Sequence, residues 1–178
     1  MTTIRPFSCD DLFKFNNINL DSLTETYNIS FYLTYLAQWP DLFYVSESPN
    51  NNLMGYMMGK AEGRGINWHG HVTAITVAPQ YRRLGLAKLM MDQLEEISDK
   101  IYKGYFVDLF VRASNAVAIG MYKQLGYSIY RTVIGYYTGG GTIDSPAEDA
   151  YDMRKALSRD THKESVVPLG RPIYPHEL

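Results

Sequence analysis

Residues 77–87 read Val-Ala-Pro-Gln-Tyr-Arg-Arg-Leu-Gly-Leu-Ala, and this stretch decides the fold. It joins a β-branched segment, which predicts a strand, to the start of a helix. The first N–H groups of a helix have no acceptor within the helix and lie at the positive end of its dipole, so such a turn binds phosphate. Gly85 and Ala87 let a ligand approach the backbone, and Arg82 and Arg83 add charge. Taken alone, the stretch also fits a basic loop that joins a strand to a helix and binds no ligand.

The segments around this turn predict alternating strands and helices. After it, Leu86, Leu89, Met90, Leu94 and Ile97 share one face at helical spacing, which indicates an amphipathic helix. Before it, β-branched, aromatic and alternating apolar residues between turn signals predict three successive strands. These strands are expected over residues 42–46, 53–60 and 71–77.

The two ends of the chain complete the pattern. Near the N-terminus we expect a helix capped by Ser8 and extending through Ile18, and a second helix over 31–39 that ends at Pro40. Downstream we expect a buried strand, a helix closed by Gly126, and two antiparallel strands joined by a mobile Gly-rich loop. Their ranges are 105–111, 116–125, 127–137 and 150–157, with the loop at 139–141.

This order predicts one α/β domain, a mixed sheet with helices on its faces, over residues 1–157. Residues 158–178 contain three prolines and are expected to form a polar tail without a core of its own.

Composition excludes several classes of protein. With 178 residues, 46% hydrophobic and 20% charged, the chain is unlike disordered or disulfide-scaffold proteins. Its net charge of −2 argues against bulk attraction to nucleic acid or membranes, and no apolar run is long enough for a membrane span. The single cysteine, Cys9, suits a reducing compartment and so a cytoplasmic location. No metal is expected, because the four histidines include no i, i+4 pair with an acidic companion.

Two ordered motifs carry a resemblance to a known family. The run from Arg82 to Ala87 resembles the Gln/Arg-x-x-Gly-x-Gly/Ala motif of the GNAT acetyltransferase superfamily, which holds the pyrophosphate of acetyl-CoA. Asn115 at a helix start, followed by Ala118, Tyr122 and residues 125–127, resembles a second element of that family. The resemblance implies a mostly antiparallel sheet of about seven strands with helices on both faces, and acetyl-CoA as acetyl donor.

Further stretches resemble the catalytic subunits of N-terminal acetyltransferases, over about residues 1–160; they are 15–20, 25–27, 39–40 and 136–137. Within that group the strongest resemblance is to the NatB type, in the stretches 16–21, 68–74 and 149–155. The resemblance implies acetyl transfer to the α-amine of nascent chains that begin Met-Asp, Met-Glu, Met-Asn or Met-Gln. It also implies a large helical-repeat auxiliary subunit that docks on the ribosome.

The resemblance assigns roles to individual residues. His71 is the first candidate for the general base, Tyr122 for the acid that protonates the departing thiolate, and Glu25 for holding or deprotonating the substrate ammonium. An α-amine has a pKa near ~7.7 to 8.0, so only a weak base is needed. The expected acetyl-CoA contacts are Ile75, Thr76, Val77, Arg82, Arg83, Leu84, Gly85, Leu86, Ala87, Asn115 and Tyr122. The expected peptide contacts are Glu25, Tyr27, His71, Thr73, Tyr136 and Tyr137.

Each assignment has a structural alternative. His71 could be a hydrogen-bonded structural histidine, Glu25 a solvated loop residue, Tyr122 core packing and Asn115 a helix cap. Of Tyr136 and Tyr137, adjacent on a strand, we expect at most one to face the substrate. Two other functions stay open at this point. The chain could acetylate lysine side chains or small amines, or it could bind CoA without catalysis.

Overall fold

The computed structural model describes residues 2–20, 24–137 and 147–178. Over these ranges seven strands form one sheet in the order β1-β2-β3-β4-β5-β7-β6. β4 and β5 are parallel, and the other neighbouring pairs are antiparallel. The predicted mixed, mostly antiparallel sheet is therefore confirmed. The strands are β1 Thr3–Pro6, β2 Phe43–Glu47, β3 Leu53–Glu62, β4 His69–Val77, β5 Phe106–Arg112, β6 Ser128–Tyr137 and β7 Glu148–Ala156.

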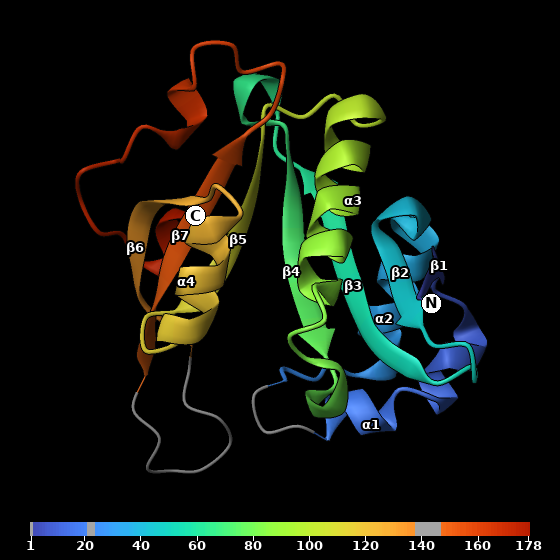
Figure 1. Ribbon diagram of the computed structural model, residues 1–178. Helices are drawn as coiled ribbons and strands as arrows, with labels where there is room; N and C mark the ends of the chain where they lie inside the picture. The colour runs from blue at the N-terminus through green and yellow to red at the C-terminus, as the bar shows by residue number, and fades with distance from the viewer. Residues whose placement is uncertain (1, 21–23, 138–146) are drawn as a thin grey trace.

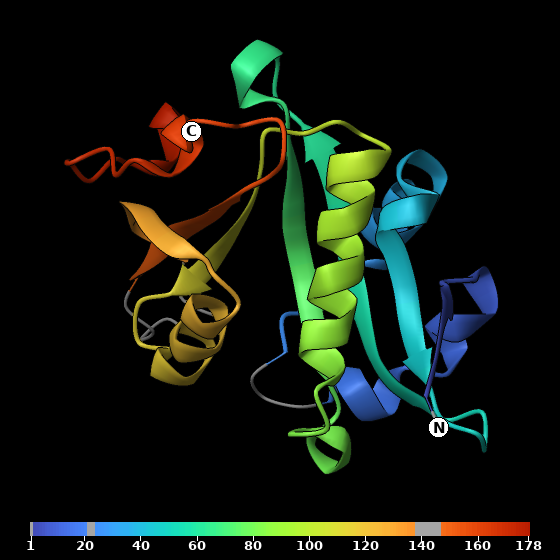
Figure 2. The ribbon, with the colours of Figure 1, turned by 45° about the horizontal axis from the view of Figure 1, so that its top comes forward.

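Helices cover both faces of this sheet (Figures 1 and 2). Alternation along β2 shows how: Phe43 and Val45 pack in one core with residues of α1 and α2, whereas Tyr44 packs in the other core with residues of α3 and α4. A half-buried strand would need only one apolar face, so the apolar run of β2 reflects burial on both sides. The helices are α1 Asn16–Asn19, α2 Ile29–Gln38, α3 Leu86–Lys100 and α4 Ala116–Gln124.

The expected N-terminal helix is wrong as a single element. The structure has a 3-10 helix over Cys9–Phe13 and a separate α1, and it adds β1, which was not predicted. The reason is non-local: Arg5, on β1, donates to Glu47 of β2 at 2.9 Å and also to the buried Asp11 carboxylate at 2.7 and 2.8 Å. This Asp11 carboxylate also accepts from the N–H and hydroxyl of Ser8. Ser8 is the N-cap of this 3-10 helix, as predicted, and forms a capping box with Asp11.

β4 and β5 stay together for only part of their length. The paired residues are Gly70 to Val72 on β4 and Val107 to Leu109 on β5. Beyond them β4 continues to Val77 beside β3, and β5 continues to Arg112 beside β7, so the two strands diverge (Figures 1 and 2). A pocket lined by residues 71–76 of β4 and 109–110 of β5 lies at this divergence.

The segment 158–178 lies against β6 and does not project from the fold. Ile173 is 1% exposed, forms a bridge with Val133, and accepts a hydrogen bond from the Ile134 N–H at 2.8 Å. Its buried side chain packs with Val133 and Ala150 in a small apolar cluster. The polar segment is therefore anchored to the sheet through Ile173. The division of the chain at residue 157 stays a prediction, and the loop expected at 139–141 lies outside the described residues.

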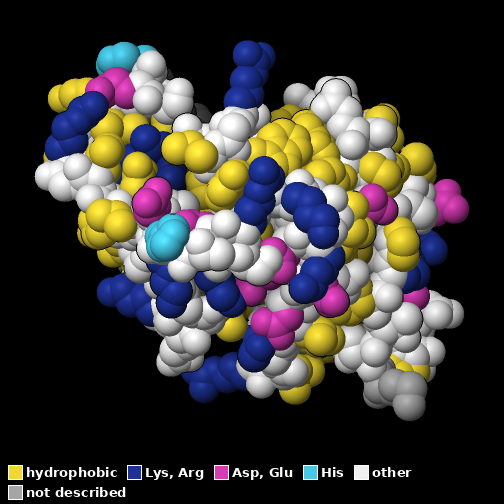
Figure 3. Space-filling model, turned by 90° about the horizontal axis from the view of Figure 1, so that it is seen from above, with side chains coloured by type: hydrophobic (Ala, Val, Ile, Leu, Met, Phe, Trp, Pro, Cys, Tyr) yellow, Lys and Arg dark blue, Asp and Glu magenta, His cyan; other side chains and the backbone are white. Residues whose placement is uncertain are grey.

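Surface features agree with the composition. In Figure 3 the Lys and Arg side chains stand among Asp and Glu side chains, without a broad face of one charge. In the parts of the chain that the structure describes, no helix has both the length and the apolar character that crossing a bilayer requires.

Candidate active site

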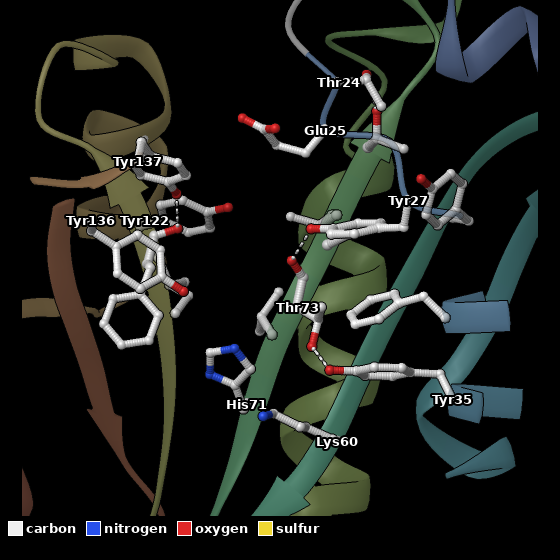
Figure 4. Close-up of a pocket in the computed structure, with 18 residues that line it drawn as sticks. Thr24, Glu25, Tyr27, Tyr35, Lys60, His71, Thr73, Tyr122, Tyr136 and Tyr137 are labelled. Carbon is white, nitrogen blue, oxygen red and sulfur yellow. Dashed lines mark hydrogen bonds between the residues drawn. The ribbon is translucent and has the colours of Figure 1, made fainter. Parts of the chain in front are cut away.

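A pocket lies where β4 and β5 separate (Figure 4). The segment before α2 forms one wall, and α4, β5 and the end of β6 form the opposite wall. Its floor consists of β3 and β4. The lining residues are Thr24, Glu25, Tyr27, Phe31, Tyr35, Tyr56, Lys60, His71, Val72, Thr73, Ala74, Ile75, Thr76, Leu109, Phe110, Tyr122, Tyr136 and Tyr137. The structure thus brings together all the predicted peptide contacts.

His71 is held by a carboxylate that the sequence did not single out. It is buried on β4, and its Nδ1 lies 2.7 Å from Oδ1 of Asp108, its register partner on β5. Burial alone would raise the pKa of Asp108, but the charge of His71 and hydrogen bonds from His69 and His71 lower it well below its usual range. An ionised carboxylate accepts from Nδ1–H of His71, and this hydrogen bond favours the tautomer with the lone pair on Nε2 whenever the imidazole is neutral. A single acidic residue inside the apolar run 105–111 was the only sequence signal of this pairing.

A second histidine shares the same carboxylate. His69 Nε2 lies 3.4 Å from Oδ2 of Asp108, and its Nδ1 lies 2.6 Å from the carbonyl oxygen of Asn67. Burial opposes protonation of His69, but the hydrogen bond and charge of Asp108 outweigh it and raise its pKa.

The two histidines, together with Glu62, form a group of side chains that could bind a metal ion. Glu62, His69 and His71 each offer one potential ligand atom, and these atoms lie within 4.8 Å of one another. The helical i, i+4 spacing could not reveal this group, because residues i and i+2 share a face on a strand. Nδ1 of His71 already lies 2.7 Å from Asp108, and Nε2 of His69 lies 3.4 Å from the same carboxylate. The absence of a metal stays a prediction.

Tyr122 enters the pocket from α4. Its side chain is 7% exposed, and its ring packs edge-on against Tyr127 with 6.0 Å between the ring centroids. Burial raises the pKa of the Tyr122 phenol, so the hydroxyl is protonated at neutral pH. Tyr122 therefore both packs in the core and lines the pocket.

Glu25 is bound to an arginine on the opposite wall. Its Oε1 accepts a hydrogen bond from Nη2 of Arg112 at 2.7 Å, and Arg112 also contacts Glu148 at 3.2 Å. The Arg112 guanidinium lies over the ring of Tyr137, 4.1 Å from its centroid. Glu25 is thus not an unpartnered loop residue, and Arg112, at the end of β5, is a residue that sequence reasoning missed.

Hydroxyl groups connect the segment before α2 to β4. Tyr27 donates a hydrogen bond to the carbonyl oxygen of Thr73 at 3.3 Å, and the Thr73 hydroxyl donates to the Tyr35 hydroxyl at 2.8 Å (Figure 4). The hydroxyls of Thr24 and Thr76 lie 2.8 Å apart. Tyr35, on α2, also lines the pocket.

Both Tyr136 and Tyr137 line the pocket, and the expectation that at most one of them faces the substrate stays a prediction. The pairing of β6 with β7 is irregular between Val133 and Tyr137, and Gly135 has φ of +62°. A β-bulge disrupts the regular alternation of side chains between the two faces of a strand. Tyr136 then stacks on Phe110 with 4.6 Å between centroids, and Tyr137 donates to the Phe110 carbonyl oxygen at 3.2 Å.

The turn predicted to bind phosphate follows the end of β4. Gly85 has φ of +78° and precedes the first residue of α3, and no atom lies within 4 Å of the place where its side chain would be. Arg82, Arg83 and Leu84 are exposed, and Nε of Arg82 donates to the Val77 carbonyl oxygen at 3.1 Å. Asn115 caps α4 by accepting from the Ala118 N–H at 3.1 Å, as its structural alternative predicted. Contacts of these residues with acetyl-CoA stay predictions.

Comparison with known proteins identifies the family of this chain. The model of the "Acetyltransferase (GNAT) family" matches residues 12–127. The catalytic subunit NAA20 of the N-terminal acetyltransferase B complex from Arabidopsis thaliana is 65% identical over 178 residues, which cover 100% of this chain and 98% of that protein.

Solved structures agree. The crystal structure of Chaetomium thermophilum Naa20 with a bisubstrate analogue matches with a TM-score of 0.91 and 43% identity, covering 98% of this chain and 97% of that one. A chain of the NatB acetyltransferase complex bound to a bisubstrate inhibitor matches with a TM-score of 0.84 and 43% identity, covering 99% and 98%. The chain belongs to the GNAT acetyltransferase family and, within it, to the catalytic subunits of NatB N-terminal acetyltransferases.

Proposed function

We propose that this protein transfers the acetyl group of acetyl-CoA to the α-amine of proteins that begin Met-Asp, Met-Glu, Met-Asn or Met-Gln. The observation that carries the proposal is the pocket at the β4–β5 split, where a buried imidazole and a buried phenol line one cavity. Ile75 and Thr76 line this cavity, and the same strand leads into the turn at 78–85. One strand thus connects a site for the reacting groups with a site for phosphate.

Acetyl-CoA, the donor substrate, fits the residues of the turn. The pyrophosphate is assigned to the first N–H groups of α3, with Arg82 and Arg83 beside them. The empty space around Gly85 admits a ligand close to the backbone. Backbone groups of residues 75–77 are assigned to the pantetheine and acetyl portions, and Asn115 lies at the start of the neighbouring α4.

The chemistry requires one proton to leave the amine and one to reach sulfur. The amine nitrogen attacks the thioester carbonyl carbon, and the carbon–sulfur bond breaks. We assign removal of the amine proton to Nε2 of His71 and protonation of the thiolate to the Tyr122 hydroxyl. About a tenth of α-amines is uncharged at neutral pH, so positioning supplies much of the acceleration. Glu25, beside Arg112 at the pocket rim, is assigned to attract the substrate ammonium.

We also propose that the protein works with a large helical-repeat auxiliary subunit, on nascent chains at the ribosome, in the cytoplasm. Apolar side chains near the N-terminal helices are exposed in the single chain, which supports a protein partner on this side. They are Phe13, Leu20, Ile29 and Leu33. The free cysteine, Cys9, agrees with a reducing compartment.

The test is an acetyl-transfer assay with peptides that differ only at residue two. We expect acetylation of Met-Asp, Met-Glu, Met-Asn and Met-Gln peptides in the presence of the auxiliary subunit, and little of Met-Lys. Equal rates on Met-Asp and Met-Lys peptides, or acetylation of a peptide with a blocked N-terminus, would contradict the NatB-type selectivity. Binding of acetyl-CoA without turnover on any peptide would favour a non-catalytic subunit instead.

A further inference from the structure

We propose that Lys60 selects acidic residues at the second position of the substrate by pairing with their carboxylate. The inference rests on the proposed function and names the side chain that distinguishes Met-Asp and Met-Glu from their amide counterparts. Lys60 was not among the residues that the sequence suggested.

The position of Lys60 follows from the sheet. It lies on β3 directly opposite His71 of β4, and both line the pocket. Directly opposite residues of an antiparallel pair point to the same face of the sheet. Figure 4 shows the Lys60 ammonium beside the His71 ring, on the pocket floor.

The charges of the pocket are complementary to such a substrate. Among the lining residues that the structure describes, Glu25 is the acidic residue and Lys60 the basic residue other than histidine. In Figure 4 they lie at opposite ends, Glu25 near Tyr137 and Lys60 beyond His71. A chain that begins Met-Asp carries an ammonium and, one residue on, a carboxylate. Glu25 already binds Arg112 at 2.7 Å, whereas Lys60 lies beside His71, the assigned base for the amine. The carboxylate, one residue beyond that amine, therefore matches Lys60.

Lys60 has the capacity for this second contact. Its Nζ lies 2.6 Å from Oε2 of Glu62, and its side chain is 25% exposed. An ammonium has three donors, so one hydrogen bond to Glu62 leaves donors for a ligand. Glu62 also holds the long side chain in place. The side-chain oxygen of Asn or Gln can accept from the same ammonium, but without a charge on the acceptor, so amides are bound less tightly than acids.

The experiment compares Met-Asp with Met-Asn peptides of otherwise identical sequence, on the catalytic subunit with its auxiliary subunit. Asn has nearly the shape of Asp and differs in charge. We expect Lys60→Met to raise KM for Met-Asp by about 10- to 100-fold, as loss of a charge-assisted hydrogen bond implies. KM for Met-Asn is expected to rise by less than about 5-fold, since only a neutral acceptor is lost.

Two further variants separate charge from packing. Lys60→Arg should keep the preference for Met-Asp, whereas Lys60→Gln should lose it, and these two serve if Lys60→Met does not fold. Glu62→Gln, which frees Lys60 from its present partner, should keep the preference. Added salt should weaken the preference of the wild type more than that of Lys60→Met.

The outcomes are distinguishable from those of the main proposal. An unchanged ratio of Met-Asp to Met-Asn KM values in Lys60→Met and Lys60→Gln would overturn the role of Lys60 while leaving acetyl transfer intact. So would an equal loss on both peptides, because a supporting role in the fold affects both. A wild-type complex that acetylates neither peptide would count against the proposed function itself.

Discussion

Nδ1 of His71 lies 2.7 Å from Oδ1 of Asp108, although the two residues are 37 positions apart in the chain. They meet where β4 and β5 are still paired, just before the strands diverge around the pocket. A buried carboxylate thereby fixes which imidazole nitrogen carries the proton, so that the other can accept one from a substrate.

Asp108→Asn tests this arrangement. Asparagine keeps the shape but removes the charge that favours a proton on Nδ1 of His71, so we expect kcat to fall by about 10- to 100-fold. KM for acetyl-CoA should change less than kcat, because the assigned pyrophosphate site is at the far end of β4. Steady-state kinetics with a Met-Asn peptide provide the measurement. A fall confined to KM, with kcat retained, would contradict a positioning role for Asp108.

Tyr122→Phe removes the hydroxyl assigned to protonate the thiolate. The ring stays, and with it the packing against Tyr127. We expect kcat to fall by about 100-fold, as loss of a general acid implies, with the Kd of acetyl-CoA nearly unchanged. Tyr127→Phe is a matched control, because its hydroxyl binds Glu95 at 3.0 Å and it does not line the pocket. Wild-type turnover in Tyr122→Phe would remove this residue from the acid role.

Replacing Arg82 and Arg83 by alanine should weaken acetyl-CoA binding by about 10-fold or more, and added salt should narrow the difference from the wild type. Calorimetric titration at two ionic strengths measures this. Lys100→Ala removes a cation at the other end of α3 and should leave the affinity unchanged. Equal losses in the arginine and lysine variants would point to general electrostatic attraction and not to a phosphate site.

For folding, glycine is favoured at Gly85 by its backbone conformation, because the protein leaves room there for a Cβ. The position has φ of +78° and nothing within 4 Å of an added Cβ, so Gly85→Ala should destabilise the fold by about 1 kcal/mol. Gly120 in the middle of α4 has equally open space without a positive φ. Gly120→Ala should therefore stabilise the fold by about 0.5 to 1 kcal/mol. Urea unfolding of both variants gives the comparison, and effects of the same sign would refute the conformational argument.

His69 should contribute to stability in a pH-dependent way. Its pKa is raised above the ordinary 6.5, so protonated His69 stabilises the fold fully below about pH 6.5. This contribution is lost as the pH rises through the higher pKa of the folded state. The free energy of unfolding should therefore differ most between wild type and His69→Gln at pH 5 to 6, and less at pH 9. A difference that grows with pH would show that His69 is not stabilised as a cation.

The sequence by itself determined the features that depend on local pattern. Apolar periodicity located α3, β-branched runs located β3 and β4, and Pro40 marked the end of α2. The turn around Gly85 could be predicted because one short stretch contains the glycine, the helix start and the two arginines. Motif resemblance then selected His71, Tyr122 and Glu25, all of which line the pocket.

Only the tertiary structure decided how those side chains are partnered. Asp108 reaches His71 through the parallel register of β4 and β5, and Arg112 reaches Glu25 across 87 positions of the chain. Both Tyr136 and Tyr137 enter the pocket because of a bulge that strict strand alternation does not contain. Periodicity reports which face of an element is buried, but strand register and bulges depend on contacts between segments remote in sequence. The charges around a reacting group are therefore set by the fold as a whole.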